Sequence, residues 1–169
     1  MPTFYLIRHA KAEAREHWDR PDVERPLTRR GHEQARLLAS YLTDLGGRRP
    51  SRILSSEAVR CRQTVGDLAK AAKLPVVDAT WLMEGSDAAQ ALDHLRKLAK
   101  RLDPPAGTGG PVAACSHGDV IWGVLDILHR QGVDLGPHPD APKAGTWLVE
   151  MPVRGKMSAR FYQPDVARR

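Results

Sequence analysis

Short apolar segments alternate along this chain with longer stretches of helical periodicity, and this alternation restricts the folds that the chain can adopt. Six segments have the composition of β-strands: 3–7, 52–55, 76–77, 112–116, 147–151 and 158–162. Four carry apolar residues at helical spacing: 28–45, 58–72, 88–102 and 118–128. Regular alternation of strand and helix is typical of layered α/β domains. We therefore predict an α/β fold, a three-layer sandwich with a mostly parallel central sheet flanked by helices.

The length of 169 residues predicts one domain, spanning 1–169. The Pro- and Gly-rich stretch 103–111 is expected to be a surface loop, because too little chain follows it for a second domain. No apolar run approaches the roughly 18 residues of a membrane helix. The segment from Met1 to His9 lacks the basic start and the long apolar core of a signal peptide. We expect a cytoplasmic protein without a membrane partner.

The charge balance is basic, with 26 Lys and Arg against 20 Asp and Glu and a formal net charge of +6. Such an excess fits a nucleic acid, an anionic membrane surface or a small acidic substrate. The most basic stretch, 96–101, lies on an expected helix and has no aromatic neighbours, so we interpret it as a solvated helix face. A phosphate pocket needs only a few converging arginines. We therefore expect no nucleic-acid partner.

Several kinds of catalytic site are missing from the sequence. Neither a P-loop lysine motif nor a Gly-x-Ser-x-Gly elbow occurs. His32 begins a zinc-protease-like pattern, but Arg36 stands where the second histidine ligand belongs. A thiol phosphatase needs an arginine that holds the phosphoryl group close after its cysteine, and neither Cys61 nor Cys115 has one six residues on. We interpret both cysteines as small buried hydrophobic residues.

Polar residues follow three of the expected strands at the point where each strand ends. Arg8 and His9 come directly after the first strand, and Arg60 lies about one helical turn beyond the second. His117 directly follows the strand expected at 112–116. Carboxyl ends of neighbouring parallel strands share one edge, and α/β sheets bind ligands there. At that edge two arginines could clamp a phosphoryl group, while one histidine attacks phosphorus and the other hydrogen-bonds its oxygens.

Taken together and in this order, the motifs resemble those of the histidine phosphatase superfamily, which has the phosphoglycerate-mutase-like fold, and especially its short SixA-type phosphohistidine phosphatases. The matching residues are Leu6 to Ala10, Arg25 to Gly31 with Gln34-Ala35, Ile53 to Ser56 with Arg60 and Gln63-Thr64, and Cys115 to Gly118. The resemblance covers most of the chain, and the segment after Asp134 adds little to it. The chain also resembles the phosphatase-like domain that is fused behind some Nudix hydrolases. This sequence itself contains no Nudix domain.

The resemblance implies an enzyme that hydrolyses a phosphomonoester or a phosphohistidine without a metal or cofactor. His9 would be the nucleophile and would be phosphorylated transiently. The rest of the phosphate pocket would consist of Arg8, Arg60 and His117. The substrate would be a small phosphorylated compound or a phosphohistidine-bearing protein, because the short chain lacks a long insertion over the site.

Three features of the resemblance are left open by the sequence. Glu84 is the best positional match for the general acid, and Asp119 is its rival beside the second histidine. Ala10 replaces a common glycine, which is tolerable if the backbone there does not need a positive φ. Many relatives also place a polar asparagine after the first histidine as a phosphate contact. In this chain Lys11 or Arg15 would substitute for it.

Three other functions remain as alternatives to this phosphatase. The first is a nucleotide or sugar-phosphate phosphatase of the same superfamily. The second is a mutase, which fits less well because holding a substrate between two phosphoryl transfers favours a covering lid. The third is a phosphate-binding regulatory module without turnover. The physiological substrate and the oligomeric state do not follow from the sequence.

Overall fold

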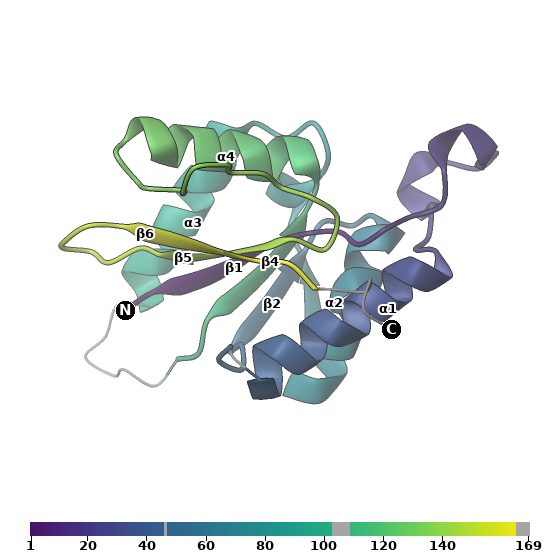
Figure 1. Ribbon diagram of the computed structural model, residues 1–169, viewed down its shortest axis with the longest axis horizontal. Coiled ribbons are helices and arrows are strands. Elements are labelled where there is room, and N and C mark those ends of the chain that lie inside the picture. Colours follow the sequence, from purple (N-terminus) through teal and green to yellow (C-terminus); the bar gives the residue numbers. More distant parts are fainter. Residues whose placement is uncertain (46, 103–108, 165–169) are drawn as a thin grey trace.

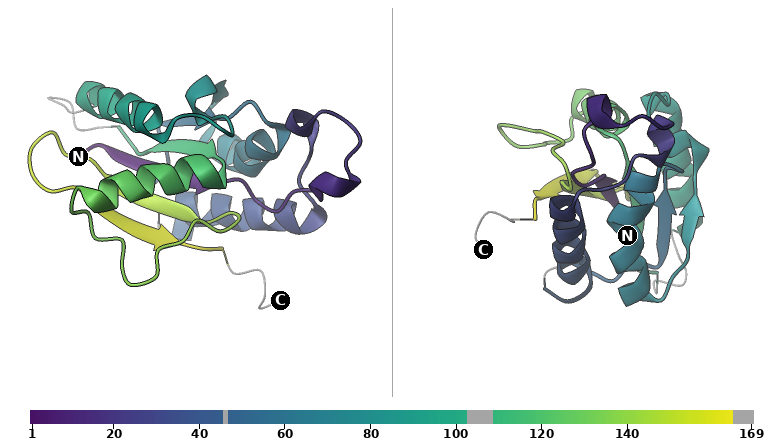
Figure 2. Two further views of the ribbon diagram at one scale, coloured as in Figure 1. Left: turned by 90° about the horizontal axis from the view of Figure 1, so that it is seen from above. Right: turned by 90° about the vertical axis from the view of Figure 1, so that its right-hand side faces the viewer.

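The protein is a three-layer α/β sandwich in a computed structural model that describes residues 1–45, 47–102 and 109–164 (Figure 1). The strands are β1 (Thr3–Arg8), β2 (Arg52–Ser55), β3 (Val76–Asp78), β4 (Val112–Ser116), β5 (Thr146–Glu150) and β6 (Ser158–Tyr162). The α-helices are α1 (Arg29–Ser40), α2 (Val59–Ala72), α3 (Ala88–Leu102) and α4 (Gly118–Arg130). The helices α1 and α2 cover one face of the sheet, and α3 and α4 cover the other (Figures 1 and 2). The predicted α/β sandwich is thus confirmed.

The strand order in the sheet is β3-β2-β4-β1-β5-β6. The first four of these strands run parallel, whereas β5 is antiparallel to both β1 and β6. The sheet is therefore mixed, so the prediction of a mostly parallel sheet needs a small correction. The connection between β5 and β6, residues 151–157, is too short for a crossover and permits only an antiparallel hairpin.

Two apolar layers hold the helices on the sheet. Along β1, Phe4 and Leu6 belong to the core under α3 and α4, whereas Tyr5 and Ile7 belong to the core under α1 and α2. This alternation is the period-two pattern of a strand that is covered on both faces. Cys61 and Cys115 are unpaired thiols buried in the second of these cores, as predicted.

The predicted elements match the observed ones closely, with differences at their ends. Thr28 caps α1, because its hydroxyl accepts a hydrogen bond from the Gly31 amide at 3.1 Å. The regular helix then ends at Ser40, five residues earlier than predicted, and continues as one wider π-type turn over Tyr41–Leu45. Most of the predicted loop at 103–111, namely residues 103–108, lies outside the described residues.

The basic side chains of the stretch 96–101 lie on the outer side of α3, as predicted. The helix buries its apolar residues, Ala91, Leu92, Leu95 and Ala99. Lys97, Lys100 and Arg101 are exposed, and Lys97 forms an ion pair with Asp93 on the preceding turn. Within the part of the chain that the structure describes, no helix combines the length and apolar character needed to cross a bilayer.

Candidate active site

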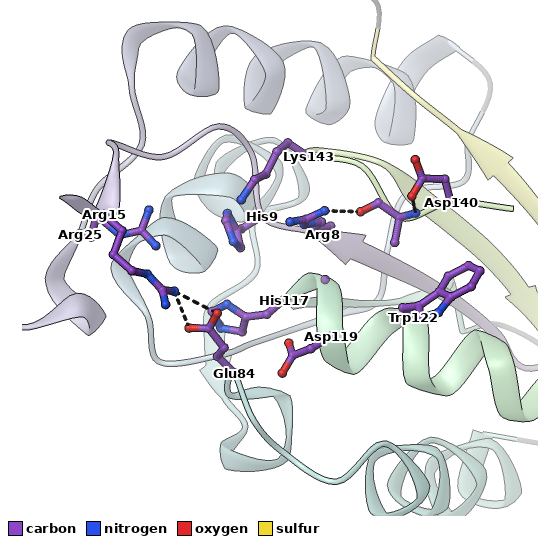
Figure 3. A pocket seen from close by; sticks show the side chains of 12 residues that line it. Arg8, His9, Arg15, Arg25, Glu84, His117, Asp119, Trp122, Asp140 and Lys143 are labelled. Atoms are coloured by element: carbon purple, nitrogen blue, oxygen red, sulfur yellow. Dashed lines mark hydrogen bonds and ion pairs between the residues drawn. The ribbon is translucent and has the colours of Figure 1, made fainter. Parts of the chain in front are cut away.

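The carboxyl ends of β1, β2 and β4 meet at one edge of the sheet. The amide of His9 donates to the Ser116 carbonyl at 3.0 Å, and the amide of Ser56 donates to the Cys115 carbonyl at 2.9 Å. These bonds extend the parallel ladder beyond the strands and fix the residues that follow them. A cavity of about 550 Å³ opens at this edge, with His9 and His117 in its wall (Figure 3).

His9 presents one ring nitrogen to this cavity. The side chain is only 4% exposed, and its Nδ1 lies 2.8 Å from the carbonyl oxygen of Ala10. Because a carbonyl can only accept, Nδ1 carries the proton, and Nε2 is left with its lone pair. Burial and the positive charge of Lys143 lower the pKa of His9 to about 2. The imidazole is therefore neutral at physiological pH and can act as a nucleophile.

His117 faces His9, with ring centroids 5.3 Å apart and planes inclined by 64°. Its Nε2 lies 2.8 Å from the Ser56 hydroxyl, and its Nδ1 lies 3.4 Å from Nη2 of Arg60. Since a guanidinium can only donate, these contacts together fit a ring that accepts at Nδ1 and donates from Nε2 to Ser56. Cys61 Sγ lies beside the same ring, 3.5 Å from Nε2. His117 is thus held in a fixed orientation toward the space in front of His9.

Arg8 is fixed at the end of β1 by a carbonyl and a glycine. Its Nη1 donates to the Ala141 carbonyl at 2.6 Å. The guanidinium packs directly on Gly118, the first residue of α4, where a Cβ would lie 2.8 Å from Arg8 Cζ. Its Nε is buried without a hydrogen-bond partner. The close approach therefore requires glycine at position 118 and places a cation beside a helix N-terminus, an arrangement that favours an anion.

Arg60 is 1% exposed and lies between two carboxylates and His117. Its Nη1 donates to the Asp22 carbonyl at 2.9 Å, and its Nη2 lies 3.1 Å from both Asp22 Oδ2 and Glu84 Oε2. Desolvation raises the pKa of Asp22, but a hydrogen bond from Arg25 and the charge of Arg60 outweigh it and lower that pKa. The buried guanidinium is thus neutralised by carboxylates that a bound phosphate could replace.

The two candidate acids lie on the same wall of the cavity but have different partners. Glu84 accepts hydrogen bonds from Arg60 and, at 3.1 and 3.2 Å, from Arg15. Asp119, in the first turn of α4, accepts the Gly85 amide at 2.7 Å. Glu84 is therefore linked directly to the arginine that faces His117, whereas Asp119 is tied to the loop at Gly85. Figure 3 shows the pair that Glu84 forms with Arg15.

The remaining motif residues hold the loop after His9 in place. The amide of Ala10 donates to Thr64 Oγ1 at 2.9 Å, and the amide of Lys11 donates to Gln34 Oε1 at 2.9 Å. At Gly31, a Cβ would lie 2.0 Å from the Lys11 carbonyl oxygen, so only glycine allows the loop this close to α1. Ala10 has no positive φ and packs in a small apolar cluster. Alanine is therefore compatible with this position.

Lys11 and Arg15, the predicted substitutes for the asparagine that contacts phosphate in many relatives, lie in different places. Arg15 lines the cavity but is engaged by Glu84 and, at 3.3 Å, by Asp22. Lys11 is exposed and does not line the cavity. Arg25, which the sequence offered only as part of a motif, is buried and lines the cavity through its guanidinium.

Lys143 is a lining residue that the sequence analysis missed. It precedes β5 and points into the cavity beside His9 (Figure 3). The backbone holds it there, because the Ala144 amide donates to the His9 carbonyl at 3.2 Å and the Arg8 amide donates to the Gly145 carbonyl at 3.0 Å. Burial and the charges of three neighbouring arginines lower the pKa of Lys143 to about 8. In the sequence, Lys143 is marked only by its position shortly before the strand expected at 147–151.

Comparisons with known proteins place this site in a family. The model of the histidine phosphatase superfamily (branch 1) matches residues 4–87, the half of the chain that holds Arg8, His9 and Arg60. The chain belongs to the histidine phosphatase superfamily. A curated relative, an 8-oxo-(d)GTP phosphatase from Mycolicibacterium smegmatis, is 28% identical over 162 residues, which are 96% of this chain and 48% of that protein. The chain thus spans about half the length of this relative.

Solved structures of other superfamily members share the fold. The protein histidine phosphatase SixA complexed with tungstate has a TM-score of 0.76 at 20% identity, with 96% of this chain and 97% of that chain covered. The putative phosphohistidine phosphatase SixA from Agrobacterium tumefaciens has a TM-score of 0.70 at 24% identity, with 97% and 99% covered. These likenesses confirm the phosphoglycerate-mutase-like architecture of the histidine phosphatase superfamily for this chain.

Proposed function

We propose that this protein is a phosphatase that transfers a phosphoryl group to Nε2 of His9 and then hydrolyses the phosphohistidine. The observation that carries the proposal is the tautomer of His9. Its proton is committed to the Ala10 carbonyl, so a neutral Nε2 lone pair faces the cavity beside the cationic side chains of Arg8 and Lys143. A neutral imidazole among fixed positive charges is a nucleophile already placed beside the site for a dianion.

The phosphoryl group would lie between His9 and His117, with Arg8 and Arg60 as its clamp. Attack of Nε2 on phosphorus forms the N–P bond as the bond to the leaving oxygen breaks. Arginine donors suit this task because they hold the equatorial oxygens in pairs. A water molecule then attacks the phosphorus of phospho-His9, which releases phosphate and restores the neutral imidazole. A curated relative named as a phosphatase and the SixA neighbours support this class of reaction.

We assign the general acid to Glu84 rather than Asp119. A bound phosphate would take the place of the Glu84 carboxylate on Arg60 and leave that carboxyl group beside the phosphoryl group. The freed carboxyl would lie next to the departing oxygen, because Arg60 also faces His117. Asp119 keeps its hydrogen bond to the Gly85 amide. Among the described residues, it has no ion pair with Arg8 or Arg60 that would bring its carboxyl group to the leaving oxygen.

Lys143 would supply the additional phosphate contact for which Lys11 or Arg15 was considered. It lies on the His9 side of the cavity, whereas Lys11 is outside and Arg15 is paired with two carboxylates. A lysine is a point charge on a flexible stem, so it can follow the phosphoryl group as it moves from substrate to His9. Its charge also helps to keep His9 neutral.

Hydrolysis of p-nitrophenyl phosphate by the purified protein tests this function. We expect turnover by the wild type and by the control variant His32→Ala, whose side chain is exposed on α1. His9→Ala should retain the wild-type circular dichroism spectrum and lose turnover. Chelators should not reduce the rate. Hydrolysis by folded His9→Ala would refute the proposal, and phosphate binding without hydrolysis of any phosphoester or phosphoramidate would favour a regulatory module instead.

A further inference from the structure

The cavity has two chemically different ends. Cationic side chains surround His9, whereas Trp122 from α4 and Asp140 lie toward the opposite end, and Asp119 lies between Trp122 and His117 (Figure 3). Carboxylates repel phosphoryl oxygens, so this end does not serve the phosphate. A cavity of about 550 Å³ is within the size range of small-molecule sites and has room for more than a phosphoryl group. The end near Trp122 is therefore suited to the rest of the substrate.

Trp122 is not required by the packing of α4. The helix packs on the sheet through Val120, Ile121, Val124 and Leu125, which are all buried. The Trp122 side chain is 43% exposed and lies in the wall of the cavity. An indole is a large apolar surface, and this one lies half-exposed in the wall of the cavity, where a bound molecule can reach it. Its flat face offers a stacking platform for a planar group.

The neighbouring carboxylates supply hydrogen-bond acceptors next to this platform. Asp119 uses one oxygen for the Gly85 amide, and Asp140 uses one oxygen for the Ala141 amide, each at 2.7 Å. The second oxygen of each carboxylate is then positioned as an acceptor by a bond already made to the backbone. Acceptors beside an aromatic face match a ring that is flat and carries N–H donors on its edge.

We propose that the substrate is a nucleoside monophosphate, whose base stacks on Trp122 and donates N–H groups to Asp119 or Asp140. This assignment rests on the proposed function, because the phosphate of the nucleotide must lie at His9 for the base to extend toward α4. Sugar phosphates without a base would leave the indole uncovered. A phosphohistidine-bearing protein would place a peptide backbone there, which has amide donors but no ring to stack.

The test compares guanosine 5′-monophosphate with ribose 5-phosphate, which has the same phosphate and sugar but no base. We expect the wild type to have a higher kcat/KM for the nucleotide. Trp122→Ala should lower the ratio of the two kcat/KM values by roughly 5- to 100-fold, the range that base–aromatic stacking gives. Trp122→Phe should retain most of the preference. The matched control is Phe161→Ala, because Phe161 is equally exposed at 44% but lies on β6 away from this cavity.

Binding to the His9→Ala variant, measured by calorimetry with the same two compounds, separates this inference from the proposed chemistry. A nucleotide preference that disappears in the His9→Ala, Trp122→Ala double variant upholds the platform even if the enzyme works by another mechanism. Equal binding of the two compounds overturns the inference while leaving the phosphatase intact. Faster hydrolysis of a phosphohistidine protein than of nucleotides, unaffected by Trp122→Ala, would overturn it as well.

Discussion

At the scale of single residues, the site depends on the difference between two titratable groups that lie side by side. His9 is neutral because burial and Lys143 oppose its protonation, whereas Lys143, with a pKa of about 8, is largely charged at pH 7. The pair therefore consists of a free lone pair and an adjacent cation over the ordinary physiological range. In the proposed mechanism, this state would combine a nucleophile with a ligand for the dianionic substrate.

Replacing Lys143 should change both the rate and its pH dependence. In the free wild-type enzyme, kcat/KM should decline as pH rises through about 8, because Lys143 loses its proton. Lys143→Met should lower kcat/KM at pH 7 by about 10- to 100-fold, which is what a hydrogen bond to a charged group contributes. The same variant should no longer show the decline of kcat/KM at alkaline pH. Lys143→Arg should keep the rate high at alkaline pH. The measurement is kcat/KM for p-nitrophenyl phosphate from pH 7 to 9.5, with exposed Lys156→Met as control. An unchanged alkaline profile in Lys143→Met would contradict the assignment.

The two candidate acids are distinguished by the leaving group. A good leaving group such as p-nitrophenolate departs without a proton, whereas an alkoxide needs one. Glu84→Gln should therefore slow hydrolysis of an alkyl phosphate by roughly 100-fold or more, and that of p-nitrophenyl phosphate far less. Asp119→Asn should affect both substrates alike. If the dependence on the leaving group appeared in Asp119→Asn and not in Glu84→Gln, the roles would be reversed.

At the scale of elements, the side chains proposed to be catalytic are placed by short segments that depend on small residues. Gly118 begins α4 and admits the Arg8 guanidinium, and Gly31 admits the loop after His9 to α1. Two polar side chains, Gln34 and Thr64, then hold that loop by its amides. These contacts explain in physical terms why the motif residues outside the cavity accompany those inside it.

A pair of glycine substitutions separates this positioning role from helix stability. Gly118→Ala puts a Cβ against the end of the flexible Arg8 side chain, so we expect it to displace the guanidinium and lower kcat/KM at little cost in stability. Gly66→Ala, in α2, meets no atom within 4 Å. It should raise the free energy of unfolding by about 0.5–1 kcal/mol through helix propensity and leave kcat/KM unchanged. Urea unfolding and steady-state kinetics on both variants provide the check, and a fully active Gly118→Ala would argue against a fixed Arg8.

The convergence of Arg8, Arg60 and His117 could be predicted from the sequence because it follows from topology. Parallel neighbouring strands bring their carboxyl ends to one edge, so residues at those ends must meet. Lys143 could not be predicted in this way. It reaches the site because β5 pairs antiparallel with β1, and the turn before β5 has Ala144 at a φ of 59°, a position with no glycine to signal it. Trp122 likewise follows only from knowing which face of α4 the sheet covers.

At the scale of the whole molecule, most of the positive charge lies away from the cavity. The net charge of +6 raised nucleic acid and membrane surfaces as alternatives. Arg8, Arg25 and Lys143 line the cavity and are buried or half-buried, whereas the basic stretch of α3 faces solvent on another side. In the proposed function, the remaining surplus would help to attract an anionic substrate through its long-range field.

Because His9 is buried in its neutral form, the free energy of unfolding should fall in acid. The unfolded chain protonates this histidine near its ordinary pKa of about 6.5, whereas the folded protein does not until about pH 2. The stabilisation is therefore complete above pH 6.5 and is lost as the pH falls below it. Between pH 7.5 and 5.0 the wild type should lose about 2 kcal/mol of unfolding free energy that His9→Gln does not lose. Urea unfolding of both proteins at the two pH values measures this, and parallel losses would show that His9 is not held neutral.

Detection of the phosphorylated enzyme tests the central claim most directly. The wild-type protein is mixed rapidly with excess p-nitrophenyl phosphate, quenched with denaturant at alkaline pH, where phosphohistidine survives, and digested for mass spectrometry. The account predicts one phosphoryl group, labile to acid, on the peptide that contains His9, and its absence from the His9→Ala variant. Phosphate release during turnover without any phosphorylated His9, or a phosphoryl group on another residue of the wild type, would contradict it.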